Sequence, residues 1–462
     1  MQRIALVSEH ASPLAAAGGV DSGGQNVYVA AVAHELARRG IAVDVFTRRD
    51  NPLLPAVVTM RPGVRVIHVD AGPPQHMPKE SLLPFMPAFA KALRAAFGSA
   101  SPAYDCVHAN FFMSGWAALQ ATRGSGVPLV TTFHALGRVR RLHQGDRDGF
   151  PNERFAIEDE LVQASHRVIA ECAQDRSDLL DLYAADERRI DVVPCGYDPA
   201  EFRPIPRWSA RKALGWSTDA FIVLQLGRLV PRKGIDTVID AIGRLKRDHS
   251  TAAELYVVGG STERPNAIAT PEIGRLHDCA VAADVDAQVH FVGRRDRCEL
   301  HRYFSAADVF VTTPWYEPFG ITPVEAMACG TPVVGSAVGG IRTTVVDGVT
   351  GLLVPPKDGA ALADRLAGLA NDRPTRIAMG EAGRERANAL FTWSRVAEQL
   401  VDVYRHAAAD ARGERYVASP SRSPEDETAT SAASAGQARV AGVRLSSRDV
   451  RRAAGLARVS AG

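Results

Sequence analysis

Residues 312–336 read TTPWYEPFGITPVEAMACGTPVVGS. An apolar run comes just before this stretch and a pair of valines lies near its end, so the pattern predicts a strand, a loop, a short helix and a second strand. Thr322 is expected as the N-cap of the helix, with Pro323 at its first position and Gly330 at its end. The loop then lies at the carboxyl end of a strand, which is where open α/β sheets bind their ligands.

Two glutamates lie on either side of the predicted turn. Glu325 stands three residues after Thr322, so it is either the glutamate of a capping box or a ligand-binding residue. Glu317 has no such structural explanation, because it precedes Pro318 in a loop that presents backbone N–H groups at a helix N-terminus. Loops of this kind bind anions and hydroxyl groups. We therefore expect a ligand site here.

The stretch EPFGITPVE, residues 317–325, resembles the E-x7-E motif of the retaining, nucleotide-sugar-dependent glycosyltransferases of family 4 and its relatives, which include sucrose-phosphate and glycogen synthases. The turn, the expected helix cap and both glutamates all stand at the positions that the motif requires. The resemblance implies that Glu317 holds hydroxyl groups of the donor sugar and that Glu325 binds the ribose. It further implies that the loop offers backbone donors and a hydroxyl to the ligand, from Phe319, Gly320, Ile321 and Thr322.

The composition limits the classes of protein that this chain can belong to. With 462 residues, of which 46% are hydrophobic, the chain is long enough for two domains and a tail. A net charge of +2 argues against a nucleic-acid partner. The six cysteines are scattered and are expected to be reduced thiols. No apolar run has the length of a secretory leader or a membrane span, so a cytoplasmic enzyme is expected, and peripheral contact with a membrane is left open.

The first residues predict a βαβ unit, with strands at 3–7 and 41–47 and a helix at 25–39. Gly23 and Gly24 lie in the turn before the helix, where glycines let backbone N–H groups approach a phosphate. The turn does not read G-x-G-x-x-G and no acid ends the second strand, so the dinucleotide fingerprint is absent. A plain flexible turn is the alternative. The family resemblance implies that these two glycines face the donor diphosphate.

Alternating strand and helix patterns continue to the strand at 128–132, which leads into His134. A lone histidine is more often structural than catalytic. Its position past a strand end and the resemblance together imply that His134 lines the reacting centre, near the donor sugar and the acceptor.

The second half of the chain opens after the turn-rich residues 194–199. A strand at 221–227 delivers Arg228 and, five residues later, Lys233 beside a helix N-terminus, which suits a diphosphate leaving group. A solvated basic loop is the alternative. The resemblance extends to this pair, since the R-x4-K pair of the family binds the donor phosphates. It also implies that the backbone at Arg294, after the strand at 288–293, meets the nucleobase.

The strand and helix pattern predicts an α/β fold with two Rossmann-like domains facing a cleft, the GT-B architecture. We place an acceptor domain at 1–195 and a nucleotide-sugar donor domain at 196–410, whose last helix crosses back to the first domain in many such enzymes. Residues 411–462 turn to Ser, Ala, Arg and Pro without apolar periodicity until about residue 440, which predicts a disordered tail.

Other functions fit the sequence less well. The D-x-D triplets at 146–148 and 284–286 lie in a polar loop and at a helix end, and no zinc motif is present, so no metal or cofactor is expected. A glycoside hydrolase or a phosphorylase-like enzyme would need the two carboxylates but not the glycine turn with Arg228 and Lys233. No tyrosine precedes a lysine at the spacing that a nucleotide-sugar epimerase needs. A non-catalytic two-lobed sugar-binding protein should carry a leader.

The resemblance implies retaining transfer of a hexosyl unit from a nucleoside diphosphate sugar to an acceptor hydroxyl. Arg228 and Lys233 would neutralise the charge that develops on the leaving diphosphate in place of a metal ion. The acceptor is expected to be a small sugar, a sugar phosphate or a glycolipid.

Relatives that act on inositol phosphate hold the acceptor phosphate with a lysine, a tyrosine, a threonine and an arginine. The matching positions here are Lys79, Phe111, Ala135 and Arg154, so both hydroxyl groups are missing and both charges remain. An exposed, solvated lysine and arginine are the alternative. The residues between 138 and 147 include four arginines, which could attract an anion. We therefore expect an anionic acceptor that is held differently from inositol phosphate.

Overall fold

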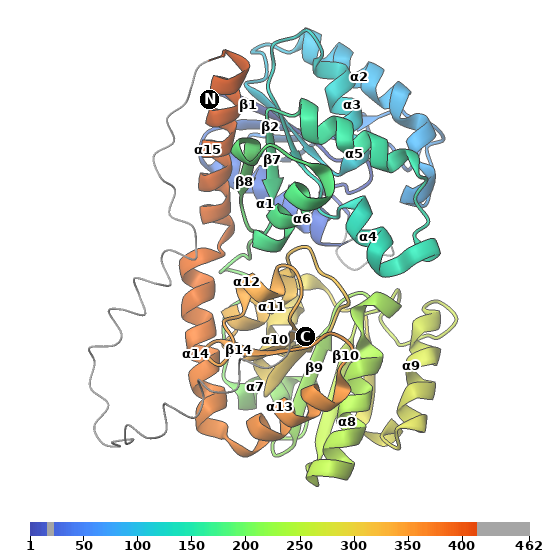
Figure 1. The fold of residues 1–462 in the computed structure, drawn as a ribbon, viewed down its shortest axis with the longest axis vertical. Coiled ribbons are helices and arrows are strands. Elements are labelled where there is room, and N and C mark those ends of the chain that lie inside the picture. The colour runs from blue at the N-terminus through green and yellow to red at the C-terminus, as the bar shows by residue number, and fades with distance from the viewer. Residues whose placement is uncertain (16–22, 414–462) are drawn as a thin grey trace, which may run out of the picture. The chain divides into compact units, whose positions relative to one another are not determined.

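The computed structural model describes residues 1–15 and 23–413, which belong to one compact unit (Figure 1). Residues 16–22 of the small-residue loop lie outside this range, and so does the predicted disordered tail from residue 414 onward.

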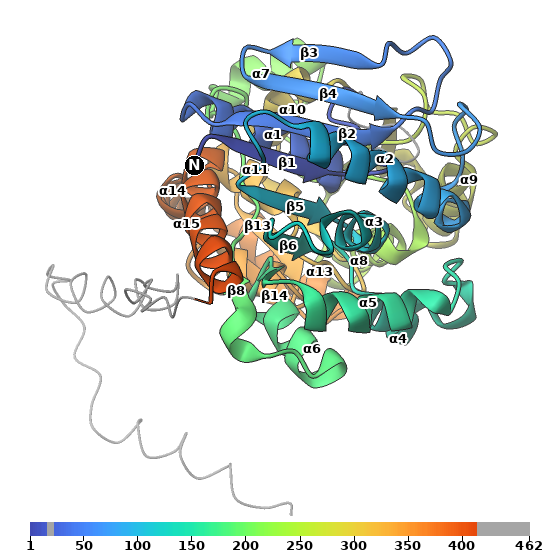
Figure 2. The ribbon, with the colours of Figure 1, turned by 90° about the horizontal axis from the view of Figure 1, so that it is seen from above.

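The first sheet has eight strands in the order β3-β4-β2-β1-β5-β6-β7-β8. All neighbours run parallel except β3, which pairs antiparallel with β4 at the edge of the sheet (Figure 2). The strand bounds are β1 Arg3–Val7, β2 Ala42–Arg48, β3 Val57–Arg61, β4 Val64–Val69, β5 Cys106–Asn110, β6 Leu129–Thr132, β7 Arg167–Ala170 and β8 Ile190–Val192. We call the part of the chain that builds this sheet the first half.

The second sheet has six parallel strands in the order β11-β10-β9-β12-β13-β14. Their bounds are β9 Phe221–Leu226, β10 Ala253–Val258, β11 Val289–Gly293, β12 Val309–Thr312, β13 Val333–Ser336 and β14 Gly351–Val354. We call this part the second half. The predicted α/β class with two parallel sheets is confirmed.

Helices cover both faces of each sheet, because successive strand residues point to opposite faces. In β1, Ile4 and Leu6 pack with α1, whereas Ala5 and Val7 pack with α2 and α3. The longer helices are α1 Gly24–Arg38, α2 Met86–Ser99, α3 Phe112–Thr122, α4 Gly137–Gln144, α5 Glu153–Ala164, α6 Ala173–Tyr183, α7 Arg207–Leu214, α8 Ile235–His249, α9 Pro271–Ala282, α10 Leu300–Ala306, α11 Ile321–Ala328, α12 Ile341–Thr344, α13 Gly359–Asn371, α14 Arg373–Leu390 and α15 Trp393–Ala411.

The last helix, α15, packs against the first sheet although it follows the second (Figure 1). It contacts α1 and the strands β5, β6 and β7. Tyr404 is fully buried there, and its hydroxyl lies 2.8 Å from Nδ1 of His108. At the end of the helix, the Asp410 carboxylate accepts a hydrogen bond of 2.8 Å from Nε of Arg167. The end of the described chain is therefore tied to the first half.

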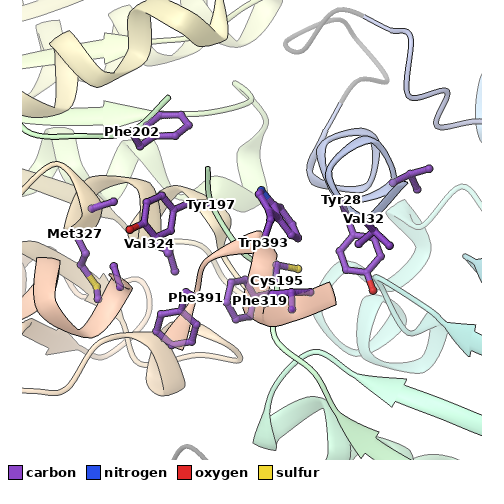
Figure 3. Close-up of a cluster of buried hydrophobic side chains, with 14 of the residues drawn as sticks. Tyr28, Val32, Cys195, Tyr197, Phe202, Phe319, Val324, Met327, Phe391 and Trp393 are labelled. Atoms are coloured by element: carbon purple, nitrogen blue, oxygen red, sulfur yellow. The ribbon is translucent and has the colours of Figure 1, made fainter. Parts of the chain in front are cut away.

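One buried hydrophobic cluster runs through both halves (Figure 3). Tyr28 of α1 meets Trp393 of α15 edge to face, with ring centroids 5.8 Å apart. On the other side, Phe391 lies 5.9 Å from Phe319, which belongs to the loop before α11. The sequence led us to expect a separate core for each domain. The structure adds this shared cluster, which connects α1 to the loop that carries Glu317.

We expect a chain that ends at Gly413 to keep the melting temperature of the full chain, because the composition beyond it predicts no core. A chain that ends at His406 should melt at a lower temperature, since it loses the buried residues Ala407 and Ala409 and the partner of Arg167. Thermal unfolding of the three chains measures this. A fall in melting temperature already at Gly413 would assign a stabilising role to residues 414–462.

Candidate active site

The loop between β12 and α11 leads into the expected helix, but the residue that caps this helix differs from the predicted one. Helix α11 begins at Ile321, and its N-cap is Gly320, whose φ of +89° is in the left-handed region. The prediction that Thr322 is the N-cap was wrong, because it lies inside the first turn, and Glu325 is therefore not a capping-box residue. Gly320 takes the cap because glycine adopts positive φ without the steric penalty of a side chain.

Neighbouring turns pack tightly against this loop. A Cβ atom on Gly339 would overlap the carbonyl oxygen of Glu317, and one on Gly340 would overlap the backbone of Phe319. The N–H of Trp315 donates to the carbonyl of Arg232 at 2.9 Å, and the Thr313 hydroxyl donates to the carbonyl of Gly234 at 2.7 Å. The loop of Glu317 and the turn of Lys233 are thus joined through their backbones.

Lys233 and Glu317 form an ion pair within this arrangement. Lys233 ends the 3-10 turn Pro231–Lys233, and its ammonium donates to Oε2 of Glu317. Burial alone would raise the pKa of Glu317, but the charges of Lys233, Arg232 and Arg228 outweigh it and lower that pKa. Burial lowers the pKa of Lys233.

Arg232 is a third cation that the sequence reading overlooked, although it directly precedes Lys233. Its guanidinium lies 5.3 Å from the ring centroid of Tyr316, and its buried Nη1 has no hydrogen-bond partner within the described residues. Three cations, namely Arg228, Arg232 and Lys233, therefore surround the single Glu317 carboxylate. The positive charge in excess suits a dianionic ligand.

The glycine turn of the first half lies against this cation cluster. A Cβ atom on Gly23 would lie 3.8 Å from the guanidinium carbon of Arg228, and one on Gly24 would lie 3.4 Å from Cδ1 of Ile321. Gly23 is the N-cap of α1 and Gly24 is its first residue, at the helix end where the first N–H groups have no acceptor within the helix. The two halves therefore approach each other at the residues that were predicted to bind phosphate.

A cavity of about 410 Å³ opens between the two halves at these residues. This volume lies in the range of small-molecule sites. Of the residues singled out from the sequence, Arg154 does not line it. The lining includes Gly23, Gly24, Lys79, Phe111, His134, Arg228, Lys233, Arg294, Glu317, Phe319, Gly320, Ile321, Thr322 and Glu325.

Glu325 lines the cavity and has a partner that the sequence did not reveal. Its side chain is 1% exposed, and Oε1 lies 2.7 Å from Nη1 of Arg297, at the start of the turn Arg297–Glu299. Burial raises the pKa of Glu325, and Arg297 opposes that shift. Arg297 also binds Glu201 at 2.8 Å and covers the ring of Phe202. A ribose at Glu325 would lie beside this guanidinium.

His134 lines the same cavity from the first half. It follows β6 with a φ of +56°, which is uncommon for a residue other than glycine. Its Nδ1 lies 2.8 Å from Oε1 of Glu171, and its Nε2 lies 3.0 Å from Oδ1 of Asn110. The side chain is therefore fixed on both sides.

Two family models match the two halves of the chain. The model for Glycosyltransferase Family 4 matches residues 22–201, and the model for Glycosyl transferases group 1 matches residues 206–386. The D-inositol 3-phosphate glycosyltransferase of Kineococcus radiotolerans is 38% identical over 430 residues, which cover 90% of this chain and 98% of that protein. This chain is a family 4 glycosyltransferase.

Solved structures agree with this assignment. The sucrose-phosphate synthase of Thermosynechococcus elongatus superposes on the enzyme with a TM-score of 0.81 at 35% identity, covering 89% of this chain and 100% of that one. HepE of Anabaena, at 21% identity, shares the fold with a TM-score of 0.68 over 88% of this chain and 100% of that one. The predicted GT-B fold is confirmed.

The cavity wall formed by the first half differs from the expectation that Arg154 would bind an acceptor phosphate. The enzyme buries Arg154 to 1% exposure, which contradicts the alternative of an exposed arginine. The guanidinium binds Oε1 of Glu158 at 2.7 Å and donates to the carbonyl of Ala135. It also lies within about 5 Å of three ring centroids, those of Phe111, Phe112 and Phe150. This charge therefore packs against the Phe111 ring and does not line the cavity.

Two other side chains line that wall instead. Arg140 extends from α4, where the sequence predicted only a polar loop, and its guanidinium binds Oδ1 of Asp148 at 2.8 Å. His10 lies after β1 with its Nδ1 2.8 Å from Oε1 of Glu9, and its ring meets Phe111 edge to face. The cavity wall formed by the first half therefore carries basic side chains other than Arg154.

Several smaller expectations can be compared with the described residues. Within residues 1–15 and 23–413, no group of three His, Cys, Asp or Glu side chains is placed to hold a metal ion. Asp148 and Asp284 of the D-x-D triplets pair with Arg140 and Lys246. All six cysteines are free thiols, as expected. Among the described helices, none combines the length and the apolar character needed to cross a bilayer.

Proposed function

We propose that the enzyme transfers a hexosyl unit from a nucleoside diphosphate sugar to an acceptor hydroxyl with retention of anomeric configuration. The observation that carries this proposal is the cluster of Arg228, Arg232 and Lys233 around Glu317, at the carboxyl edge of the second sheet. A leaving diphosphate gains negative charge as its bond to the sugar breaks. Cations that are already in place stabilise this charge more in the transition state than in the ground state.

The cavity also supplies groups for the rest of the donor. The N-terminus of α11 presents the backbone of Gly320 and Ile321 beside Glu317, which would accept hydrogen bonds from sugar hydroxyls. The glycine turn at Gly23 and Gly24 would close over the diphosphate from the first half. Glu325, together with Arg297, would bind the ribose of the donor.

The carboxylates of the cavity support transfer without a covalent glycosyl-enzyme. Its three acids each have a partner among the described residues: Glu171 binds His134, Glu317 binds Lys233 and Glu325 binds Arg297. A paired carboxylate is a poor nucleophile, which also weakens the glycosidase alternative. We propose that the acceptor attacks on the face that the diphosphate leaves and that its proton passes to the departing phosphate oxygen.

A nucleotide-sugar screen tests this proposal. The wild-type protein is incubated with uridine, guanosine and adenosine diphosphate sugars, and binding is measured by thermal shift, because a ligand of the folded state raises the melting temperature. Nucleoside diphosphate release and the anomeric configuration of the product are then measured by NMR. A product with inverted configuration, or hydrolysis of glycosides without a nucleotide donor, would refute the proposal.

Activity is expected to be unchanged in excess chelator, because Lys233, Arg228 and Arg232 supply the charge that a metal ion supplies in other transferases. The measurement is the rate before and after treatment with EDTA and dialysis, with Mg²⁺ or Mn²⁺ added back. Activity that disappears and then returns with the metal would assign a ligand role to acids such as Asp146 and Asp148.

We further propose that the acceptor carries phosphate or another anionic group. The names of the similar proteins are D-inositol 3-phosphate glycosyltransferase and sucrose-phosphate synthase, and the acceptor side of the cavity is basic here through Lys79, Arg140 and His10. Phe111 and Ala135 offer no hydroxyl where relatives have two. The anion would therefore be bound nearer to α4 than in the inositol-phosphate pose.

Arg140→Ala is expected to raise the acceptor KM about 10-fold or more and to leave the donor KM unchanged, since a hydrogen bond to a charged group contributes roughly 1.5–3 kcal/mol. High salt should also weaken acceptor binding. Arg141→Ala is the matched control, because Arg141 lies on the same helix but binds Asn152 and covers Phe155. A neutral acceptor whose KM is indifferent to Arg140 and Lys79 would contradict the proposal.

A further inference from the structure

A buried carboxylate that the proposed reaction does not use contacts His134. Glu171 is 3% exposed and follows β7, while His134 follows the neighbouring strand β6. Asn110 ends β5 on the other side of β6. Because these strands are parallel and adjacent, their carboxyl ends bring the three side chains together. Glu171 and His134 both line the donor and acceptor cavity.

The hydrogen bonds around the imidazole indicate its protonation. Nδ1 faces a carboxylate oxygen of Glu171, which can only accept. Nε2 faces Oδ1 of Asn110. The amide of Asn110 is oriented by its own nitrogen, which lies 3.4 Å from the carbonyls of Val7 and His108 and donates to both. Its oxygen therefore points at His134, and both ring nitrogens must donate.

The other titratable groups near this pair are neutral at pH 7. Burial, together with the neighbouring His134, lowers the pKa of His108 to about 3. Burial, together with the neighbouring Glu171 carboxylate, raises the pKa of Asp175 to about 8. Burial also raises the pKa of the Tyr28 hydroxyl and of the Cys195 thiol well above their usual values. Among these groups, Glu171 is the one counter-ion of the imidazole.

We infer that Glu171 is a positioning residue that holds His134 as an imidazolium, so that the first half contributes a fixed positive charge to the wall of the active-site cavity. This inference rests on the proposed function for its kinetic consequence. The charge would act on the leaving diphosphate together with Arg228 and Lys233 of the second half. Cys195, whose thiol donates to Oε1 of Glu171 at 3.2 Å, orients the carboxylate, whereas Asp175 accepts a hydrogen bond of 2.9 Å from the backbone N–H of Glu171.

Nitrogen-15 NMR of histidine-labelled protein tests the protonation state without any substrate. In the wild type at pH 7, both nitrogens of His134 should give imidazolium shifts, with the signal assigned by its loss in His134→Ala. In Glu171→Gln the amide keeps an acceptor for Nδ1 but removes the charge, so the ring should become neutral at pH 7. A neutral His134 in the wild type would overturn the inference even if the enzyme transfers sugar as proposed.

Kinetics then test the consequence with the donor found by the nucleotide-sugar screen. Glu171→Gln should lower kcat about 10-fold with little change in acceptor KM, a smaller loss than the ~10²–10³-fold that removal of a direct charge donor causes. In the His134→Ala background, Glu171→Gln should have no further effect.

Asp175→Asn is the matched control, since Asp175 is already neutral below about pH 8 and an asparagine keeps the same acceptor. It should retain wild-type kcat at pH 7. An additive loss in the double variant, or equal losses in Glu171→Gln and Asp175→Asn with equal falls in melting temperature, would assign Glu171 a purely structural role. An imidazolium signal without sugar transfer would contradict the proposed function while leaving the protonation inference intact.

Discussion

Lys233→Ala should lower kcat by ~10²-fold or more, which is the usual effect of losing one preorganised charge donor at a transition state. Lys233 forms an ion pair with Glu317, and both side chains are largely buried in the cavity. The donor KM should change less than kcat, because Arg228 and Arg232 still attract the diphosphate in the ground state. Steady-state kinetics with the true donor measure the two effects separately.

The same change also affects stability, so a second variant is needed to separate the two causes. Removing one partner of a buried ion pair leaves an uncompensated charge. Lys233→Ala/Glu317→Gln removes both charges and should melt nearer to the wild type while staying inactive. Lys246→Ala is the surface control, because Lys246 forms a half-exposed pair with Asp284 and such pairs contribute little. Wild-type turnover in Lys233→Ala would refute the diphosphate assignment.

The fold could be predicted from local pattern because it repeats one unit. Residues 3–7 form β1 as expected, and the strands predicted at 41–47, 128–132, 221–227 and 288–293 agree with the structure to within a few residues. Strands buried on both faces give continuous apolar runs, and glycines are frequent in the turns between elements. The hydrophobic pattern and the positions of the glycines are therefore enough to predict where the strands and helices lie. The edge strand β3 was missed, because Val57–Arg61 is only half-buried and carries no such run.

Helix α4 was missed for a different reason. Its sequence GRVRRLHQ has four basic residues and little apolar surface, so periodicity predicts a loop. The helix forms because tertiary contacts support it: the Gly137 N–H donates to the Glu158 carboxylate at 3.0 Å, and the guanidinium of Arg140 lies over Phe150. Those partners are distant in the chain, and their approach depends on the packing of α5.

The residues of the candidate site could be predicted where they belong to one short sequence motif. They could not be predicted where their role depends on a side chain from a distant part of the chain. The spacing of Glu317 and Glu325 and of Arg228 and Lys233 is visible in the sequence. That Arg297 pairs with Glu325 is not, because a turn 28 residues earlier supplies it. Likewise, the sequence around His134 does not indicate that its side chain binds Glu171. Such pairs follow from strand order, which single-sequence patterns do not specify.

Arg154→Ala should chiefly destabilise the enzyme rather than raise the acceptor KM. The side chain is buried, and Glu158 also accepts hydrogen bonds from the Gly137 N–H and the Tyr183 hydroxyl. Loss of Arg154 leaves that carboxylate without its cation and opens a cavity beside three phenylalanine rings. Breaking a buried pair typically costs about 3–5 kcal/mol. At roughly 2–4 °C per kcal/mol for a domain of this size, the melting temperature should fall by about 10 °C.

Two measurements distinguish this role from acceptor binding. Arg154→Met/Glu158→Gln removes both charges and refills part of the volume, so it should recover much of the lost stability. Its acceptor KM should stay close to that of the wild type, because neither Arg154 nor Glu158 lines the cavity. The opposite result, an Arg154→Ala enzyme with an unchanged melting temperature and a strongly raised acceptor KM, would show that Arg154 reaches the acceptor. In that case Glu158 would act as the residue that holds the arginine until the anion binds, and the acceptor would be bound as in the inositol-phosphate relatives after all.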